Sequence, residues 1–580
     1  MMAIFSCDIE TDGLNPTVVW CIAVQDIYTE ETQVFYPNEN ENFNDWVQSD
    51  DVHTLVFHNG IAFDVPILGA LVGTDFSSIT IEDTMLLSQL DNPRREGGHS
   101  LANWGEYLGF PKGDYEDWSK LSTEMVEYCI QDVKITTKVY KLMMQKGLSE
   151  DAKQLEYATK KHCSWQERTG WLFNELGAIH ILQEVNGDLR KQEEKVHEKF
   201  RPLAVWKKKK PVANRFRIDN FTRTKGYQAE VALQCHTREV NGKEEYGYWH
   251  YPELNLGSRL QVGRHLMHYG WKPEVFTATG RPKVDESTLK DVDIPEAKLI
   301  ARYLMLQKRQ GQVKSWLDAL NGKTGRIHCR VHTMGTITHR MSSSNPNLQQ
   351  VTASGKEYGS RMRSLFIVPE DKVLVGADLS GLELRCLAHY MKDDNYTKSL
   401  LTEDIHTVNQ KSAGLDNRDK AKTFIYAFLY GAGDGKIGSI VGGSVAEGKE
   451  LKENFLNNTP ALRILRERVG RASEKGYLKA LDGRHIIVRS EHASLNFLLQ
   501  SAGAIISKRA WVIFHGLATH LDYKQLGVIH DEIQIECSPD DAEDIGKLAV
   551  KAMELTTDYY KLNCPMTGTF KIGRNWNETH

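Results

Sequence analysis

The chain has 580 residues, of which 41% are hydrophobic and 26% are charged, and its formal net charge at pH 7 is -5. This length predicts several domains with large cores, whereas a mean hydropathy of -0.46 and the lack of an apolar run near the roughly 18 residues of a bilayer span argue against a membrane protein. Because no charged leader precedes the first apolar stretch and none of the nine cysteines forms a CxxC pair, we expect a protein of the reducing cytoplasm.

Charge is divided unevenly along the chain. Residues 1–150 carry 8 Lys and Arg against 25 Asp and Glu, and residues 151–580 carry 64 against 52. A basic second part fits a body that binds a polyanion such as DNA, although chance asymmetry is an alternative on charge alone.

The first expected element is a strand over residues 2–10, whose two-residue period places Asp8 and Glu10 on one face. A helix that carries Asp64 is expected over 62–71. Further strands are expected before this helix, over 17–27, 32–37 and 52–60.

The apolar periodicity of residues 123–143 is helical, so Tyr128 and Asp132, four residues apart, share a face. A phenol at that place can orient a water molecule that a metal ion also holds. Each acid alone is a weak signal, but the ordered set of DxE, Asp64 after Asn-Gly, and YxxxD indicates metal-dependent hydrolysis.

On these motifs, residues 1–150 resemble the DEDD-type 3′-to-5′ exonucleases of the tyrosine subclass, which have a ribonuclease H-like α/β fold. The resemblance implies proofreading, with Tyr128 placing the attacking water. The sequence departs from the family upstream, because Asp8 lies so close to its start that we expect no preceding domain. The implied ligands of two Mg²⁺ ions are Asp8, Glu10, Asp64 and Asp132.

Residues 151–330 are expected to be largely helical, with helices over 149–170, 174–200 and 295–320. Between them, residues 201–250 interleave aromatic residues with 11 basic and 5 acidic ones. This composition favours a surface that binds a nucleic-acid backbone, and a solvated charged hairpin is the alternative.

The last 250 residues contain a second set of acids. Residues 372–378 predict a strand that ends on Asp378, and the helix after it carries Glu383. Residues 526–536 predict two short strands joined by a tight turn whose tip exposes Asp531 and Glu532. Two aspartates that meet in a site of low dielectric repel each other, so Asp378 and Asp531 predict divalent cations; Glu383 or Glu532 could be structural.

A further helix is expected from near Asn417 to Gly431. Residues spaced four apart on a helix are displaced by about 40° around its axis at each step, so they form one stripe that winds slowly around the helix. Two cations followed by two aromatics suit a triphosphate at one end and a base or sugar at the other, although an ordinary amphipathic helix would explain the aromatics alone. The stripe consists of Arg418, Lys422, Tyr426 and Tyr430.

With these motifs, the chain resembles family A DNA polymerases, and most closely the replicative enzymes of short-tailed bacteriophages. The resemblance implies a multidomain α/β and α+β protein in which the exonuclease domain is followed by a right-hand polymerase. It places the thumb at 151–330, the fingers at about 400–480, and the palm at about 331–399 and 481–580.

The same resemblance implies roles for single residues. Asp378 and Asp531 would bind two Mg²⁺ ions, which Mn²⁺ could replace, with Glu532 beside them. Arg418 and Lys422 would hold the triphosphate of the incoming dNTP, and Lys422 would donate a proton to the leaving pyrophosphate.

Residues that select the nucleotide and hold DNA are implied in the same way. Glu383 would exclude ribonucleotides together with Tyr426, and a tyrosine at 426 implies acceptance of dideoxynucleotides. Tyr430 would stack near the templating base, and His406 would contact the triphosphate. The residues expected to contact the new duplex are Arg340, Asn496 and Gln500 in its minor groove and His530 at the primer.

The implied function is DNA-templated DNA synthesis with proofreading, for replication of a phage genome in the cytoplasm of an infected bacterium. A repair-type family A polymerase, a single-subunit RNA polymerase and a nuclease with an inactive polymerase body are the alternatives. Expected partners are primer-template DNA, dNTPs and a helicase-primase. Residues 201–250 would either recruit host thioredoxin or another processivity factor, or grip DNA unaided.

Overall fold

The computed structural model describes residues 3–213, 215, 223–290 and 292–580. Residue 214 and residues 216–222 of the expected basic segment lie outside this description. The chain divides into two compact units: Met1–Asn174 together with Ala319–His580 form unit 1, and Glu175–Asp318 form unit 2. In the part of the chain that is described, no helix is long and apolar enough to cross a membrane.

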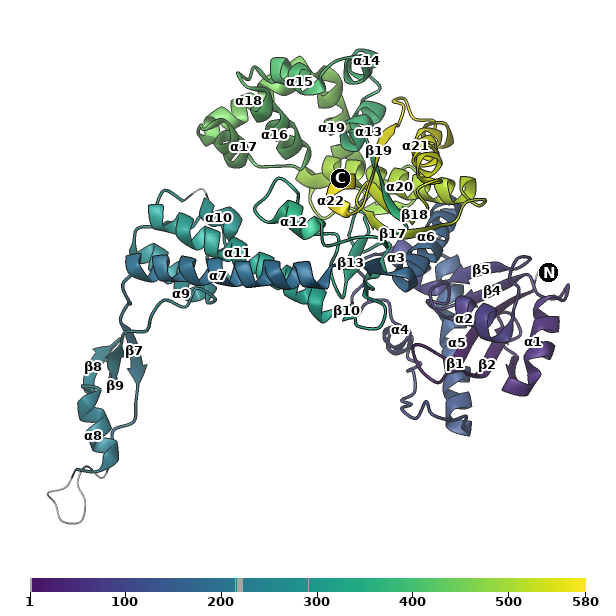
Figure 1. Ribbon diagram of the computed structural model, residues 1–580, viewed down its shortest axis with the longest axis horizontal. Helices are drawn as coiled ribbons and strands as arrows, with labels where there is room; N and C mark the ends of the chain where they lie inside the picture. Colours follow the sequence, from purple (N-terminus) through teal and green to yellow (C-terminus); the bar gives the residue numbers. More distant parts are fainter. Residues whose placement is uncertain (1–2, 214, 216–222, 291) are drawn as a thin grey trace. The chain divides into compact units, whose positions relative to one another are not determined.

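Unit 1 begins with a five-stranded mixed sheet of order β3-β2-β1-β4-β5 (Figure 1). The first three of these strands pair antiparallel, and β1, β4 and β5 run parallel. The strands are β1 (Ile4–Thr11), β2 (Val19–Asp26), β3 (Thr32–Phe35), β4 (Thr54–Phe57) and β5 (Thr80–Asp83). The helices around them are η1 (Pro37–Glu39), α1 (Asn40–Val47), α2 (Asp64–Ile67), the π-helical η2 (Leu68–Val72), α3 (Thr84–Asp91), α4 (Leu101–Tyr107) and α5 (Thr123–Met144).

The alternation of β1 decides which side chains face which helix. Cys7 and Ile9 are buried with Phe43 of α1 on one face of the sheet. Ser6 lies on the other face, where its hydroxyl donates to the Val133 carbonyl of α5 over 3.1 Å. Asp8 shares the face of Ser6 because side chains alternate along a strand, and so does Glu10.

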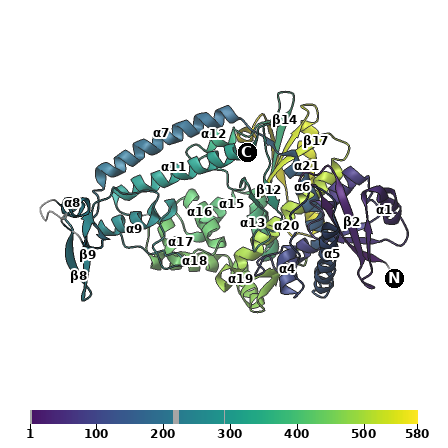
Figure 2. The ribbon, with the colours of Figure 1, turned by 90° about the horizontal axis from the view of Figure 1, so that it is seen from below.

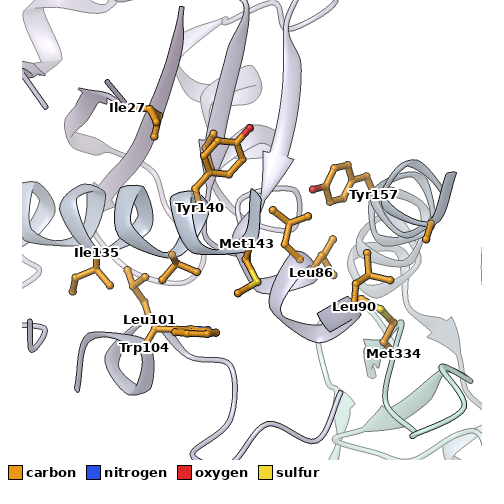
Figure 3. Packing of buried hydrophobic residues seen from close by; sticks show 14 residues of the cluster. Ile27, Leu86, Leu90, Leu101, Trp104, Ile135, Tyr140, Met143, Tyr157 and Met334 are labelled. Carbon is orange, nitrogen blue, oxygen red and sulfur yellow. The ribbon is translucent and has the colours of Figure 1, made fainter. Parts of the chain in front are cut away.

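Helix α6 (Glu150–Thr169) joins this sheet region to the rest of unit 1. Figure 3 shows Tyr157 of α6 and Met334 packed beside Leu86 and Leu90 of α3, in one buried apolar cluster. A second link is a buried ion cluster, which joins α6 to residues more than 300 positions away. The buried ion cluster consists of Glu156, Asp482, Arg484 and Lys508.

The second sheet of unit 1 is antiparallel, with the order β17-β18-β14-β19. Two long helices, α20 (Ser494–Leu517) and α21 (Ala542–Tyr559), pack against each other beside it. The strands are β14 (Val373–Leu379), β17 (Tyr523–Ile529), β18 (Glu532–Cys537) and β19 (Gly568–Gly573).

A group of helices follows α13 (Leu382–Met391) in the chain, and rings of Phe424, Phe428 and Phe455 meet in its core. The group consists of α14 (Asp394–Thr402), α15 (Ile405–Ala413), α16 (Arg418–Leu429), α17 (Asp434–Val441), α18 (Val445–Asn458) and α19 (Pro460–Ser473). The short elements of unit 1 are β6 (Trp171–Leu172), β10 (Leu320–Asn321), β11 (Arg326–Ile327), β12 (Arg330–His332), β13 (Ser342–Ser344), α12 (Gly359–Arg363), β15 (Tyr477–Lys479), β16 (His485–Ile487), η3 (Glu491–Ala493) and α22 (Trp576–Thr579).

Unit 2 is built on two long helices, α7 (Glu175–Lys199) and α11 (Pro295–Asp318), which run side by side (Figure 2). The shorter helices α9 (Arg259–His268) and α10 (Glu286–Lys290) complete its core around Phe200 and Leu304. The segment between α7 and α9 forms a separate three-stranded sheet of order β7-β9-β8. Its elements are β7 (Val205–Lys208), α8 (Lys225–Ala232), β8 (His236–Val240) and β9 (Lys243–His250).

Candidate active sites

The first candidate site lies between β1 and α5. Asp8 and Glu10 come from β1, and ligand atoms of these two residues and Cys129 lie within 4.8 Å of one another. Asp132 lies one turn after Tyr128 on α5, so the predicted shared face of this helix is confirmed. Burial is the largest cause of the raised pKa of Asp8. The negative charges of Asp132, Asp64 and Glu10 raise this pKa further.

The electrostatics of this site favour bound cations. Burial, and then the charge of Asp132, raise the pKa of Glu10 to about 9. Burial also raises the pKa of Asp64 to about 7. Asp132 Oδ1 is buried and accepts no hydrogen bond from the described residues. Carboxylate oxygens are the ligands that Mg²⁺ prefers, so these acids fit the two ions that the sequence predicts.

The helix with Asp64 differs from the prediction. The sequence predicts it over 62–71, whereas α2 begins at Asp64 and continues as the π-helical η2 to Val72. The cause is Asp83, which is fully buried and accepts from the backbone N–H groups of Asn59 (3.0 Å) and Ile61 (3.3 Å). This carboxylate holds residues 59–63 as a turn, and therefore positions Asp64.

Sequence reasoning missed Lys112 and Asp83. The Lys112 ammonium forms an ion pair with Asp132 Oδ2 and lies 4.5 Å from the ring centroid of Tyr128. Lys112 stands in an irregular segment with no periodic signal. Asp83 could have been found, because an aspartate at a strand end before a helix is a typical N-cap, and it caps α3.

The second candidate site is a cavity of about 420 Å³ in unit 1. It brings together residues from β14, α13, α16, the turn between β17 and β18, and the segment before β13. The predicted residues that line it are Arg340, Asp378, Glu383, Tyr426, Tyr430, His530 and Asp531. Lys508 also lines the cavity and was missed, although a lone Lys-Arg pair inside the apolar α20 is a visible signal.

Strand pairing brings the two aspartates together. Asp378 lies opposite Glu532 in the β14–β18 ladder, and the backbone N–H of Leu379 donates to the Asp531 carbonyl over 3.2 Å. Enclosure in the cavity, and then the Asp531 and Glu532 carboxylates, raise the pKa of Asp378 to about 7. Burial also raises the pKa of Asp531. The pair therefore suits divalent cations.

The predicted exposure of Glu532 is wrong. Its side chain is buried, because Glu532 is the first residue of β18 and faces the interior. Its carboxylate accepts hydrogen bonds from Trp576 Nε1 and from His580 Nδ1, each over 2.6 Å. Asp531 and His530 alone form the turn between the two strands.

Glu383 accepts hydrogen bonds from two of the predicted residues that line the cavity. Its carboxylate accepts from the Tyr430 hydroxyl at 2.6 Å and from Arg340 Nη2 at 2.9 Å, rather than from Tyr426. Tyr426 lines the same cavity, one helical turn earlier. The hydroxyl of Tyr430 reaches Glu383 because Tyr430 is the C-cap of α16, where the chain leaves the helix.

Helix α16 is confirmed between Asn417 and Gly431. The Asn417 side chain caps it by accepting from the N–H of Asp419 over 2.8 Å, and Gly431 ends it with a φ of 73°. Arg418 Nη2 donates to Asp404 Oδ1 over 3.1 Å at an exposed position. Burial, and then the charges of Lys422 and Arg418, lower the pKa of His406.

The residues expected at the triphosphate are not among the cavity-lining residues. Arg418, Lys422 and His406 belong to α15 and α16 outside the lining. On α20, Gln500 accepts from the Thr338 hydroxyl over 3.3 Å, and Asn496 lies one turn before it. Neither amide lines the cavity.

Comparisons with known proteins match both regions. The model of DNA polymerase family A matches residues 225–578, and that of the RNase_H superfamily matches residues 5–144. The chain is 32% identical to the DNA-directed DNA polymerases of Enterobacteria phage T3 and Escherichia phage T7, over 99% of this chain and 99% of each relative.

Other relatives match a smaller share of the chain. DNA polymerase I of Pseudomonas aeruginosa is 28% identical over 60% of this chain and 40% of its own length. Among solved structures, the POL domain of Pol1 from M. smegmatis, in complex with DNA primer-template and dNTP, has the same fold. Its TM-score is 0.75 at 18% identity, over 99% of this chain and 96% of that one.

Proposed function

Because this chain belongs to DNA polymerase family A and is a DNA-directed DNA polymerase, we propose that it replicates a phage genome and proofreads its product. The expected fold class, a ribonuclease H-like region followed by a family A polymerase region, is confirmed. The replicative role is supported by the similarity to phage enzymes over 99% of both chains. A repair role is the nearest alternative, and replication of long templates distinguishes the two.

In the polymerase site, Asp378 and Asp531 would hold two Mg²⁺ ions, and Mn²⁺ could replace them. When bound, such ions lower the pKa of the primer 3′-hydroxyl and neutralise the triphosphate. Arg418 and Lys422 bind the triphosphate of the dNTP, and Lys422 donates a proton to pyrophosphate. The cluster of positive charge around His406 supports this assignment.

Nucleotide selection belongs to the opposite end of α16. Glu383, held by Arg340 and Tyr430, excludes a 2′-hydroxyl at the sugar, which Tyr426 also contacts. The Tyr430 side chain moves away from Glu383 and stacks near the templating base. The residues that contact the duplex are Arg340, Asn496 and Gln500 in the minor groove and His530 at the primer.

In the exonuclease site, four carboxylates would hold two further ions, and the Tyr128 hydroxyl would orient the water that attacks the terminal phosphodiester. The observation that carries this proposal is the buried meeting of these acids on β1, α2 and α5, in a region separate from the polymerase cavity. The proposed ligands are Asp8, Glu10, Asp64 and Asp132.

The domain assignment also stays a proposal, with the thumb at 151–330, the fingers at about 400–480, and the palm at about 331–399 and 481–580. Unit 2 lies within the proposed thumb, and helices α15 to α19 lie within the proposed fingers. The β7-β9-β8 sheet of unit 2 supports a DNA grip. The Arg238 guanidinium lies 4.3 Å and 5.3 Å from the ring centroids of Trp206 and Trp249, and Trp249 is 43% exposed. Aromatic and cationic side chains on one face suit bases and phosphates.

The grip is tested by primer extension on a long single-stranded template with a DNA trap, with and without bacterial thioredoxin. We expect long products without thioredoxin, and shorter ones from Trp249→Ala. Long products only with thioredoxin would instead make residues 201–250 a docking site for that partner. The replicative role also implies a helicase-primase as a partner. It further implies that the protein acts in the cytoplasm of the infected host.

Two variants test the function as a whole. Asp531→Ala should abolish primer extension but retain degradation of single-stranded DNA, because the two carboxylate clusters are separate. Asp8→Ala with Glu10→Ala should do the reverse. Loss of both activities in either folded variant would contradict two independent sites, and absence of extension by the unaltered chain would overturn replication.

A further inference from the structure

Lys112 lies inside the carboxylate cluster of the exonuclease site. Its ammonium pairs with Asp132 Oδ2, and the two side chains are 22% and 4% exposed. The same ammonium lies 4.5 Å from the ring centroid of Tyr128. A single lysine thus contacts both α5 residues to which the exonuclease proposal assigns a role.

The backbone of Lys112 is held in place by two helices. A Cβ at Gly105 of α4 would lie 2.7 Å from the Phe110 carbonyl oxygen and 3.1 Å from the Lys112 nitrogen, so only glycine permits this approach. From α5, Gln131 Nε2 donates to the Pro111 carbonyl over 2.8 Å. The anchored backbone carries a long, flexible side chain, which can change partner without movement of the chain.

Charge balance indicates what that partner is. Four ionised carboxylates and two Mg²⁺ ions sum to zero, so a phosphodiester with its single negative charge would enter a neutral site. With Lys112 the loaded site carries one positive charge, which matches that phosphodiester. An ion that binds Asp132 through its unpartnered Oδ1 repels the Lys112 ammonium at Oδ2, because both are cations on the same carboxylate.

We propose that Lys112 is a catalytic residue of the exonuclease, an inference that rests on the exonuclease function proposed above. Without ions its ammonium neutralises Asp132, and with ions bound it moves to a non-bridging oxygen of the scissile phosphate. In that step the water oxygen bonds to phosphorus and the bond from phosphorus to the 3′ oxygen breaks. The water loses a proton, the 3′ oxygen gains one, and Lys112 stabilises the negative charge that develops on the phosphate oxygens.

The first test is the excision rate of a single-stranded 3′ end by Lys112→Met and Lys112→Arg. Methionine keeps most of the unbranched side chain but not its charge, and we expect a loss of about 10²–10³-fold, as for removal of one charge-stabilising donor. Lys112→Arg keeps the charge and should lose less. Primer extension should be unchanged in both variants, because Lys112 is not among the residues that line the polymerase cavity.

The second test is Mn²⁺ binding by electron paramagnetic resonance, with Asp378→Asn and Asp531→Asn present so that the polymerase site does not contribute. We expect Lys112→Met to bind Mn²⁺ more tightly while it excises more slowly, since a competing cation is lost. Weaker Mn²⁺ binding would show that Lys112 merely orients Asp132, and an unchanged excision rate would equally overturn the inference. If the unaltered chain excises nothing, the exonuclease proposal itself fails, and this inference with it.

Discussion

Glu156→Gln is expected to destabilise unit 1 strongly. Glu156 Oε1 accepts from Arg484 Nη1 over 2.6 Å and from Lys508 Nζ over 2.5 Å. All of these side chains are 1% exposed or less, and Asp482 completes the buried ion cluster by pairing with Arg484. The cluster holds two positive and two negative charges, so the substitution leaves one buried positive charge without a counterion.

The expected cost follows from that uncompensated charge. Breaking a buried ion pair by removing one partner costs about 3–5 kcal/mol. Glutamine retains one acceptor oxygen, so we expect the lower end of the range, about 3 kcal/mol, or a factor of roughly 150 in the folding equilibrium. Lys508→Met added to Glu156→Gln removes the excess charge and leaves Arg484 paired with Asp482. The double variant should therefore recover most of the loss.

The assay is differential scanning calorimetry of the full chain. Glu156→Gln should lower Tm by several degrees, and the double variant should restore most of it. Glu150→Gln is the matched control on the same helix, since Glu150 is 66% exposed, and its effect should stay within about 0.5 kcal/mol. An unchanged Tm for Glu156→Gln, or a double variant no better than the single one, would refute the reasoning.

Three further results are expected. Tyr426→Phe should make the polymerase discriminate against dideoxynucleotides, and equal incorporation before and after in a primer-extension assay would count against the assigned sugar contact. Asp378 has a pKa raised from 3.8 to about 7, so in EDTA its contribution to stability is fully present below pH 4 and is lost as the pH rises through about 7. Mg²⁺ should restore Tm above that pH, and Asp378→Asn should weaken the pH dependence; identical Tm profiles for both proteins would contradict the shift. Trp576→Ala should cost about 3–5 kcal/mol by chemical denaturation, because the fully buried indole stacks on Trp171 at 5.0 Å; a loss below about 1 kcal/mol would show that the site collapses around the cavity.

Local sequence patterns were sufficient to predict features that depend on residues a few positions apart. The alternation in β1 predicts the shared face of Asp8 and Glu10, and Asn417 with Gly431 predicts both ends of α16. The family resemblance, which rests on such motifs, also predicted seven of the residues that line the polymerase cavity. Motifs of this kind are readable because capping, periodicity and strand alternation depend on residues only a few positions apart.

The sequence by itself therefore determined the two sets of acids, the helices and strands that carry them, and the family. The tertiary structure alone decided which partners those residues meet. It buried Glu532 against Trp576, brought Glu383 into a hydrogen bond with Tyr430, and paired the Lys112 ammonium with the Asp132 carboxylate. It also assembled the buried ion cluster from α6 and segments more than 300 residues away. Burial and charge pairing between distant segments depend on how whole elements pack, and no periodicity along the chain encodes that packing.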